Sequence, residues 1–125
     1  MIFDRMFVQN DILGAAAQAA SVRNEVITSN IANADTPDYK AKAVAFEESL
    51  SRAVSRYKKT RTLDLSDVTP AVHEVMKHYN YRIDKNNVDM ELEMVNLYQN
   101  SVRFDALLNC AQTNSSRLSL AIGGR

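Results

Sequence analysis

Two histidines are the first residues to test for chemistry, because imidazoles are the commonest metal-binding side chains in proteins. His73 and His78 stand five residues apart. The helical zinc motif needs histidines four residues apart, since that spacing puts both rings on one face of a helix. Five residues turn the two side chains about 140° apart around a helix. We therefore expect no zinc site here.

A second group of oxygen-bearing side chains begins like a calcium-binding loop. Asp84 and Asn86 occupy the first two ligand positions of such a loop. Val88 stands at the third position, the turn glycine is missing, and Val95 replaces the closing glutamate. The run lacks too many ligands to hold calcium. We expect neither a metal nor any other cofactor in this chain.

The residues needed for nucleophilic catalysis are also missing. Cys110 is the single cysteine, so it forms no internal disulfide, and its expected role is that of a small buried apolar side chain. Three glycines, two of them at the C terminus, cannot build a phosphate-binding loop, and no nucleophile elbow is present. These absences predict a protein that is not an enzyme.

Composition narrows the class of protein further. The chain has 125 residues, 46% of them hydrophobic, which is enough for one domain. Fifteen basic residues balance fifteen acidic ones, so we expect no nucleic-acid partner. No apolar run is long enough to span a membrane or to act as a secretory signal. We expect no direct membrane insertion, and either a cytosolic protein or export without a cleaved signal.

The longest regular pattern runs from Val88 to Ile122 and predicts a long helix that needs a partner. Apolar and small residues recur alternately four and three positions apart, with no glycine or proline before Gly123. The members of this heptad pattern are Met90, Met94, Leu97, Ser101, Phe104, Leu108, Ala111, Ser115, Leu118 and Ile122. A second apolar stripe lies nearly opposite and consists of Val88, Leu92, Val95, Val102 and Ala106. One partner helix cannot cover both stripes.

A second helix is predicted near the N terminus, and its small alanines allow another helix to approach closely. We expect it to pair with the C-terminal helix of the same chain. The predicted contact residues are Ile12, Ala15, Ala19, Val22 and Val26 on one side and Met94, Leu97, Phe104, Leu108, Ala111 and Leu118 on the other. A further set is expected to face neighbouring subunits, and it consists of Leu13, Ala20, Ile27, Leu92, Val95, Val102 and Ala106.

The first helix must end near Ala34, because Pro37 cannot continue it. Asn30 and Asn33 carry short polar side chains that can satisfy its last backbone groups. Together with Thr36, Pro37 and Tyr39, they form an Asn-x-x-Asn-x-x-Thr-Pro-x-Tyr run. This run resembles the signature near the N terminus of bacterial flagellar rod and hook proteins.

A second resemblance lies before the C-terminal helix. Asp84, Asn86, Val88 and Asp89 match the Asp-Gly-Asn-x-Val-Asp run with which this helix begins in the proximal-rod members of that family, except that Lys85 replaces the glycine. Further on, Asn100 and Phe104 match an Asn-x-x-x-Tyr pair with phenylalanine for tyrosine. Longer family members insert extra domains between the two ends, and the shortness of this chain favours a proximal-rod subunit.

The middle of the chain is predicted to hold a short amphipathic helix followed by extended segments. Helical spacing is shared by Phe46, Leu50, Val54 and Tyr57. Alternation on either side of Pro70 predicts two short strands or arms, at Leu63 and Leu65 and at Tyr79, Tyr81 and Ile83. A basic cluster of Arg52, Arg56, Lys58, Lys59 and Arg61 is expected to be a solvated loop, with an acidic neighbour or a phosphate as the alternative.

Together these patterns predict a mainly α fold in which long N- and C-terminal helices pair as an elongated, coiled-coil-like bundle. Residues 1–35 and 88–125 form this discontinuous core, and residues 36–87 form a connecting segment, partly extended or a β-hairpin.

The resemblance implies a structural subunit of the proximal flagellar rod, which crosses the periplasm. The implied partners are other copies, other proximal-rod subunits, inner-membrane ring and rod-adaptor proteins, and the flagellar type III export apparatus. The alternative is a soluble helical adaptor or secretion chaperone that binds one partner's amphipathic helix.

Overall fold

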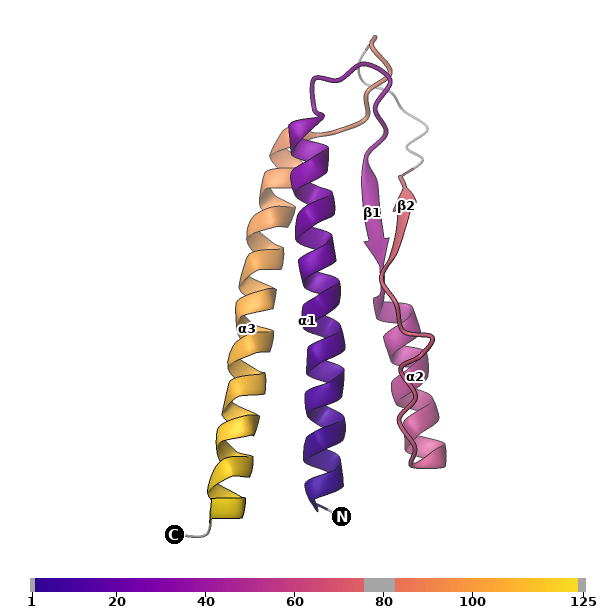
Figure 1. The fold of residues 1–125 in the computed structure, drawn as a ribbon. Helices are drawn as coiled ribbons and strands as arrows, with labels where there is room; N and C mark the ends of the chain where they lie inside the picture. Colours follow the sequence, from indigo (N-terminus) through magenta and orange to yellow (C-terminus); the bar gives the residue numbers. More distant parts are fainter. Residues whose placement is uncertain (1, 76–82, 124–125) are drawn as a thin grey trace.

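The computed structural model describes residues 2–75 and 83–123. In chain order the elements are α1 (Ile2–Ala32), β1 (Lys42–Ala45), α2 (Glu47–Thr60), β2 (Ala71–Glu74) and α3 (Met90–Gly123), as Figure 1 shows. The predicted fold class is confirmed: two long terminal helices pack together, and a short antiparallel hairpin lies in the middle.

α1 and α3 run antiparallel, with both chain termini at the same end of the molecule (Figure 1). α3 begins at Met90, two residues after the predicted start at Val88. Asp89 is the capping residue just before the first turn of the helix. The Asp89 carboxylate accepts a hydrogen bond from the backbone N–H of Leu92 at 3.1 Å, as an N-terminal cap does. α1 ends at Ala32, two residues before the predicted end.

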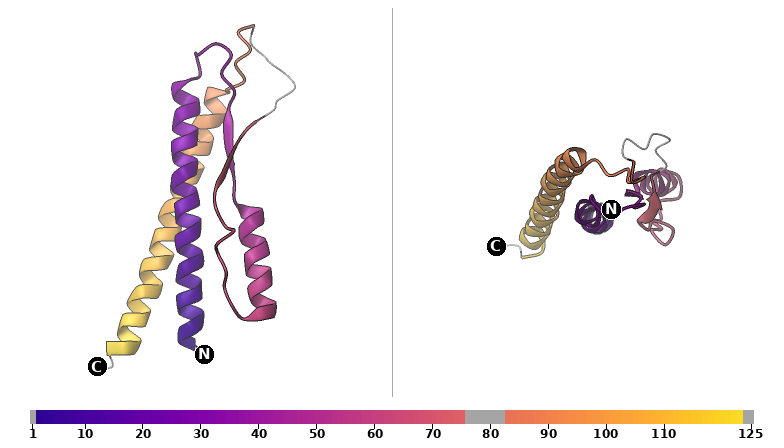
Figure 2. Two further views of the ribbon diagram at one scale, coloured as in Figure 1. Left: turned by 45° about the vertical axis from the view of Figure 1, so that its right-hand side comes forward. Right: turned by 90° about the horizontal axis from the view of Figure 1, so that it is seen from above.

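α1 is the middle layer of the molecule. Viewed from above in Figure 2, it lies between α3 on one side and the hairpin with α2 on the other. The second contact is apolar: Ala19 of α1 clusters with Phe46, Ala53 and Val68, all at most 9% exposed.

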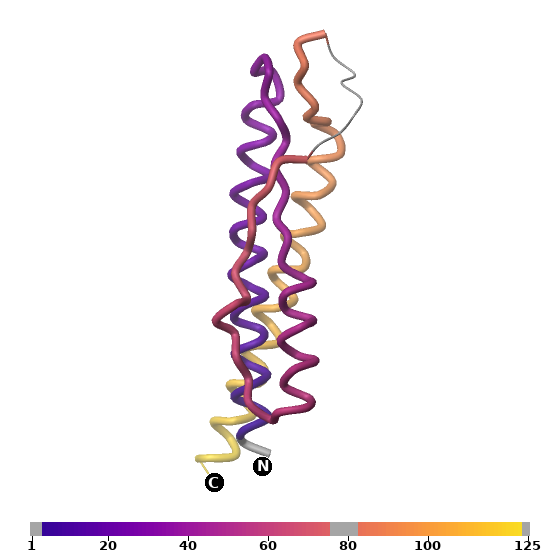
Figure 3. Tube along the Cα trace, turned by 90° about the vertical axis from the view of Figure 1, so that its right-hand side faces the viewer, coloured from indigo at the N-terminus to yellow at the C-terminus, as the bar shows by residue number. Residues whose placement is uncertain are grey.

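The middle segment confirms one prediction and corrects another. The amphipathic helix is α2, and its buried side carries Ala53. The strands, however, are at residues 42–45 and 71–74, paired antiparallel with Val44 opposite Val72. Leu63 and Leu65 belong to irregular chain that runs back beside α2, as Figure 3 shows. Both are half-buried, which explains their alternation without a strand.

The other predicted arm falls largely outside the structural description. Tyr79 and Tyr81 lie outside the described residues, and Ile83 lies in a turn. The hairpin strands that do form have four residues each, which is too short for a strand pattern to be evident in the sequence.

Candidate functional site

Three buried asparagines meet where α1 ends and α3 begins. Asn30 is 0% exposed, Asn86 1% and Asn87 7%. Burying an amide is unfavourable unless its donors and acceptors are hydrogen-bonded. All three side chains make such bonds to the backbone of other segments, and we call this region the asparagine corner.

Asn86 holds the turn that follows α1. Its side-chain Nδ2 donates to the carbonyl oxygens of Asn33, Ala34 and Thr36 at 2.9, 3.0 and 2.8 Å. Its Oδ1 accepts the backbone N–H of Val88 at 2.7 Å. These carbonyls belong to the turn that follows α1, so this one amide ties that turn to the start of α3.

Asn30 holds the edge of β1. Its Nδ2 donates to the carbonyl of Lys42 at 2.8 Å, and its Oδ1 accepts the N–H of the same residue at 2.9 Å. The amide thus takes the place of a neighbouring strand at this residue. It also receives a bond from the Tyr39 hydroxyl at 3.3 Å and donates to Glu93 of α3 at 3.3 Å, so it joins α1, β1 and α3.

Asn87 connects the two strands just beyond their ends. Its Oδ1 accepts the N–H of Ala41 at 2.7 Å, and its Nδ2 donates to the carbonyl of Val75 at 2.8 Å. The next residue, Val88, is buried against Ala34 and Ala41. The role of Asn87 was not predicted from the sequence, although two adjacent asparagines before a long helix are a signal for backbone capping.

The turn after α1 is also held by hydrogen bonds. Asn33 donates to the Ser29 carbonyl at 2.8 Å, and the Thr36 hydroxyl donates to Asn33 at 3.2 Å. The backbone N–H of Asp38 donates to the Asp84 carbonyl at 2.9 Å, which brings the two sequence runs together.

The nine residues of the two sequence runs that resemble the family, before and after the middle segment, lie in or beside this corner. They are Asn30, Asn33, Thr36, Pro37, Tyr39, Asp84, Asn86, Val88 and Asp89. Their hydrogen bonds satisfy backbone groups and one another, and the arrangement stabilises the fold rather than presenting a nucleophile.

Lys85 adopts the left-handed conformation, with φ of 60°. This is the position where the resembling family has glycine, and glycine is the residue that tolerates such a φ without a steric penalty. The Lys40 ammonium donates a hydrogen bond to the Lys85 carbonyl, which helps to hold the turn.

The face that α3 turns toward α1 differs from the predicted one. Leu97, Phe104, Ala111 and Leu118 are half-buried, but Met94 is 55% and Leu108 46% exposed. The buried positions in α3 are instead Asn100 and Asn114. Asn100 donates from Nδ2 to the Ala20 carbonyl and to Asn24 Oδ1, both at 2.7 Å. The face toward α1 thus keeps Leu97, Phe104, Ala111 and Leu118, but Asn100 and Asn114 are buried where the pattern has Ser101 and Ser115.

The predicted assignment of α1 faces is corrected as well. Ala19 and Ala15, expected to meet α3, pack with the cluster around Phe46. Ala20 and Ile27, expected to face another subunit, are 4% and 5% exposed within the chain. α1 is apolar over a wide arc and has neighbours on two sides, so spacing alone did not assign each stripe to its neighbour. The remaining predicted α1 positions, Ile12, Leu13, Val22 and Val26, are half-buried.

The second apolar stripe of α3 is exposed, and Leu92 at its start also lines a cavity with Val26 and Ile27 of α1. Leu92, Val95, Tyr98 and Val102 are 45%, 52%, 73% and 51% exposed, and Ala106 continues the row. We call these five residues the outer stripe of α3. Large apolar side chains gathered on one exposed helix face are typical of a protein interface. Cys110, expected to be buried, is exposed near the end of this face.

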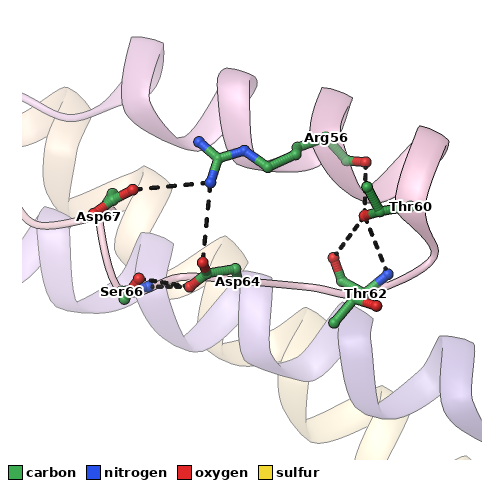
Figure 4. Close-up of polar contacts among 6 residues, drawn as sticks. All are labelled: Arg56, Thr60, Thr62, Asp64, Ser66 and Asp67. Atoms are coloured by element: carbon green, nitrogen blue, oxygen red, sulfur yellow. Dashed lines mark hydrogen bonds and ion pairs between the residues drawn. The ribbon is translucent and has the colours of Figure 1, made fainter.

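The basic cluster lies on and just beyond α2. Figure 4 shows Arg56 between Asp64 and Asp67, with ion-pair distances of 3.9 and 3.8 Å. Hydrogen bonds from the Ser66 hydroxyl and backbone N–H, aided by the Arg56 charge, hold the pKa of Asp64 below its usual value. An acidic neighbour thus exists for one member of the cluster.

The described part of the chain holds no group of three or more metal-ligating side chains. His73 is exposed on β2, and His78 lies outside the described residues. Within residues 2–75 and 83–123, no helix is both long and apolar enough to cross a membrane.

Comparison of the sequence with known proteins relates this chain to a protein family. A family profile described as flagella basal body rod protein matches residues 11–40, which include the first half of the asparagine corner. The chain is 35% identical over 123 residues to flagellar basal body rod protein FlgB of Bacillus subtilis, covering 94% of this chain and 93% of the relative.

Two further relatives come from other bacteria. FlgB of Cereibacter sphaeroides is 34% identical over 91% of this chain and 95% of its own length. FlgB of Escherichia coli K12 is 30% identical over 81% of this chain and 80% of its own length. The chain belongs to the FlgB family of flagellar basal body rod proteins.

Proposed function

We propose that this chain is a structural subunit of the proximal flagellar rod and acts by assembly rather than by catalysis. The observation that carries the proposal is the outer stripe of α3, an apolar face that the chain leaves uncovered. Contacts of one face with a different face of the next copy do not close on themselves, and they build helical tubes. A tube of this kind can transmit torque across the periplasm.

The asparagine corner supports the same role. A shaft subunit must keep a fixed geometry under load, and the buried amides fix how α1, the hairpin and α3 meet. Hydrogen-bonded buried amides specify one arrangement, because any other leaves donors and acceptors unpaired. The partners we propose are further copies and other rod subunits, with the inner-membrane ring, rod-adaptor proteins and the type III export apparatus at the rod base.

The test compares two substitutions on opposite sides of α3. Val95→Asp puts a charge on the outer stripe and should block incorporation into basal bodies while the purified chain keeps its helix content. Leu97→Asp buries a charge on the half-buried side and should unfold the helix pair, since an unpaired buried charge is strongly destabilising. Incorporation is measured by isolating basal bodies from cells whose only copy is the variant.

A crosslink separates folding from assembly in the same experiment. Asn24 and Asn100 meet at 2.7 Å, so cysteines at these positions, in a Cys110→Ser background, report the pairing of α1 with α3. We expect the crosslink in Val95→Asp and its loss in Leu97→Asp. Normal incorporation of Val95→Asp would contradict the proposal and favour an adaptor that stays a monomer or closed dimer.

A further inference from the structure

Each of the two long helices carries a pair of asparagines 14 residues apart, Asn10 and Asn24 on α1 and Asn100 and Asn114 on α3. Fourteen residues make nearly four helical turns, so the two asparagines of each helix point in nearly the same direction and stand about 21 Å apart. Asn24 is bonded to Asn100, so in this antiparallel arrangement Asn10 lies opposite Asn114. We call Asn24 with Asn100 the central layer and Asn10 with Asn114 the terminal layer.

The central layer shows how this chain pairs asparagines across the two helices. Asn100 is buried, and its Nδ2 donates to Asn24 Oδ1 and to the Ala20 carbonyl, both at 2.7 Å. Midway between the two layers, Ala17 of α1 and Leu107 of α3 are both half-buried. The contact between the helices therefore continues from the central layer toward the terminal layer.

The terminal layer has the same two residue types without the hydrogen bond. Asn114 is 9% exposed, and its Nδ2 is buried with no partner among the described residues. Asn10 Oδ1 is buried in the same unpaired state. A buried donor or acceptor without a partner costs free energy. One group is a donor and the other an acceptor, so a single hydrogen bond between them would remove both costs.

The helices separate beyond the terminal layer. Figure 2 shows the C-terminal end of α3 lying away from the start of α1. Phe7 on α1 and Leu120 and Ile122 on α3 belong to this end, and all three are exposed. A neighbouring copy that contacts apolar side chains of both helices binds the pair better when the two helices lie together. Such a contact shifts the pair toward the closed arrangement.

We propose that the α1–α3 pair closes at this end when the chain joins the rod, and that Asn114 Nδ2 then donates to Asn10 Oδ1. This inference rests on the proposed rod assembly and adds two positioning residues to it. A buried asparagine pair fixes the register of two helices, because other registers leave the amides unpaired. A shift by one heptad, for example, would place Asn10 opposite Leu107. Two layers about 21 Å apart would hold the helix pair along most of its length.

The first test replaces the two asparagines of the terminal layer separately and together. Asn10→Leu or Asn114→Leu, as the only copy, should enter basal bodies about tenfold less than wild type, because the remaining amide stays unpaired in the closed pair. The double variant should return to within about twofold of wild type, because two leucines form an apolar layer with no unpaired group. Each asparagine acting alone would instead make the double variant at least as poor as the worse single variant.

Controls separate this effect from misfolding. The isolated single variants should keep the helix content of wild type by circular dichroism, because the bond of the terminal layer is not made in the isolated chain. Gln18→Leu, at an exposed position of α1, should assemble normally. Wild-type incorporation of both single variants, or failure of the double variant to recover, would overturn the inference. If Val95→Asp still blocked incorporation, the proposed rod function would survive that result.

A crosslink measures the closing directly and leaves both asparagines in place. Met6 lies four residues before Asn10 and Leu118 four residues after Asn114, so cysteines at Met6 and Leu118, with Cys110→Ser, face each other in the closed pair. Under the same oxidant, the intrachain disulfide should form at least about tenfold faster in basal bodies than in the isolated chain, because only the closed pair brings the two thiols within bonding range.

The matched control places cysteines between the two layers. With cysteines at Ala17 and Leu107, again with Cys110→Ser, the disulfide should form at similar rates in basal bodies and in the isolated chain, since both residues are half-buried there already. Equal rates for the cysteines at Met6 and Leu118 in the two samples would overturn the inference independently of the leucine variants.

Discussion

The two ends of the α1–α3 pair are held together in different ways. At the asparagine corner, Asn30, Asn86 and Asn87 bond to the backbone of several segments. At the opposite end, Asn10 Oδ1 and Asn114 Nδ2 are buried without a partner among the described residues. Figure 2 shows the C-terminal end of α3 lying away from the start of α1. We call this second region the open end.

The unpaired atoms of the open end complement each other. Asn24 contacts Asn100, Asn10 precedes Asn24 by 14 residues, and Asn114 follows Asn100 by 14. In an antiparallel pair this places Asn10 and Asn114 at the same level, one with a free acceptor and the other with a free donor. Buried hydrogen bonds therefore fix the asparagine corner, whereas the open end holds buried polar atoms without a partner among the described residues.

The largest expected effect comes from removing the Asn86 amide, which ties the turn after α1 to the start of α3. Asn86→Ala should lower the free energy of unfolding by about 3 kcal/mol, because several buried backbone groups lose their partner together. Urea unfolding followed by circular dichroism measures it. Asn109→Ala, at an exposed asparagine of α3, is the matched control and should change little. If Asn86→Ala lowered the free energy of unfolding no more than Asn109→Ala does, the Asn86 hydrogen bonds would not stabilise the asparagine corner.

The next prediction compares substitutions at two buried asparagines of α3, Asn100 and Asn114. Asn100→Ala should lower the free energy of unfolding by about 2 kcal/mol, because the Ala20 carbonyl loses its donor. Asn114→Leu should raise it by about 1 kcal/mol, because a buried amide group without a partner is replaced by an apolar side chain. The same unfolding assay applies. Opposite signs support the contrast between the ends, and equal losses would contradict it.

These two regions also differ in how well the sequence predicts them. Asn33 and Pro37 were identifiable, since caps and turns depend on side chains close in sequence. Asn87 was not, since its partners Ala41 and Val75 are 46 and 12 residues away. The face with which α3 packs on α1 was not identifiable from the sequence, because Met94 and Leu108 fit the apolar heptad pattern and Asn100 interrupts it. A hydrogen bond between Asn100 and Ala20, 80 residues apart, leaves no local pattern in the sequence.

A smaller effect is expected at Lys85. Lys85→Gly should raise the free energy of unfolding by about 0.5 kcal/mol, because the relief of left-handed strain slightly exceeds the added entropy of glycine in the unfolded chain. Thermal unfolding measures the change. Lys85→Ala keeps the steric penalty and should bring no gain. If Lys85→Ala stabilised the chain as much as Lys85→Gly, backbone strain would not be the cause.

The smallest effect is the pH dependence of the bond that ties the start of α2 to α1. Partial burial alone raises the pKa of Glu47, but the hydrogen bond and charge of Arg23 and nearby backbone N–H groups outweigh it, so its net pKa is lowered from 4.5. Arg23 donates to Glu47 at 2.6 Å. A lowered folded-state pKa contributes stability above 4.5 that is lost as the pH falls through the folded value.

Melting temperatures measured against pH test this bond. Wild type should melt slightly higher than Glu47→Gln at pH 7, and the difference should shrink as the pH falls below 4.5. Glu48→Gln, at an exposed neighbour, is the control and should show no such trend. A difference between wild type and Glu47→Gln that stays constant across this range would show that the ionised Glu47 does not stabilise the fold.

The antiparallel pairing of α1 with α3 also has a kinetic consequence. Its side-chain bonds join residues far apart in the chain, such as Asn30 with Glu93, 63 positions away. Closing so long a loop costs entropy before any contact forms, so non-local pairings slow folding. We expect α2 and the hairpin to form before the terminal helices meet. A chain whose longest helices pair last keeps them apart for longer after synthesis, as the passage through the type III export apparatus proposed above would require.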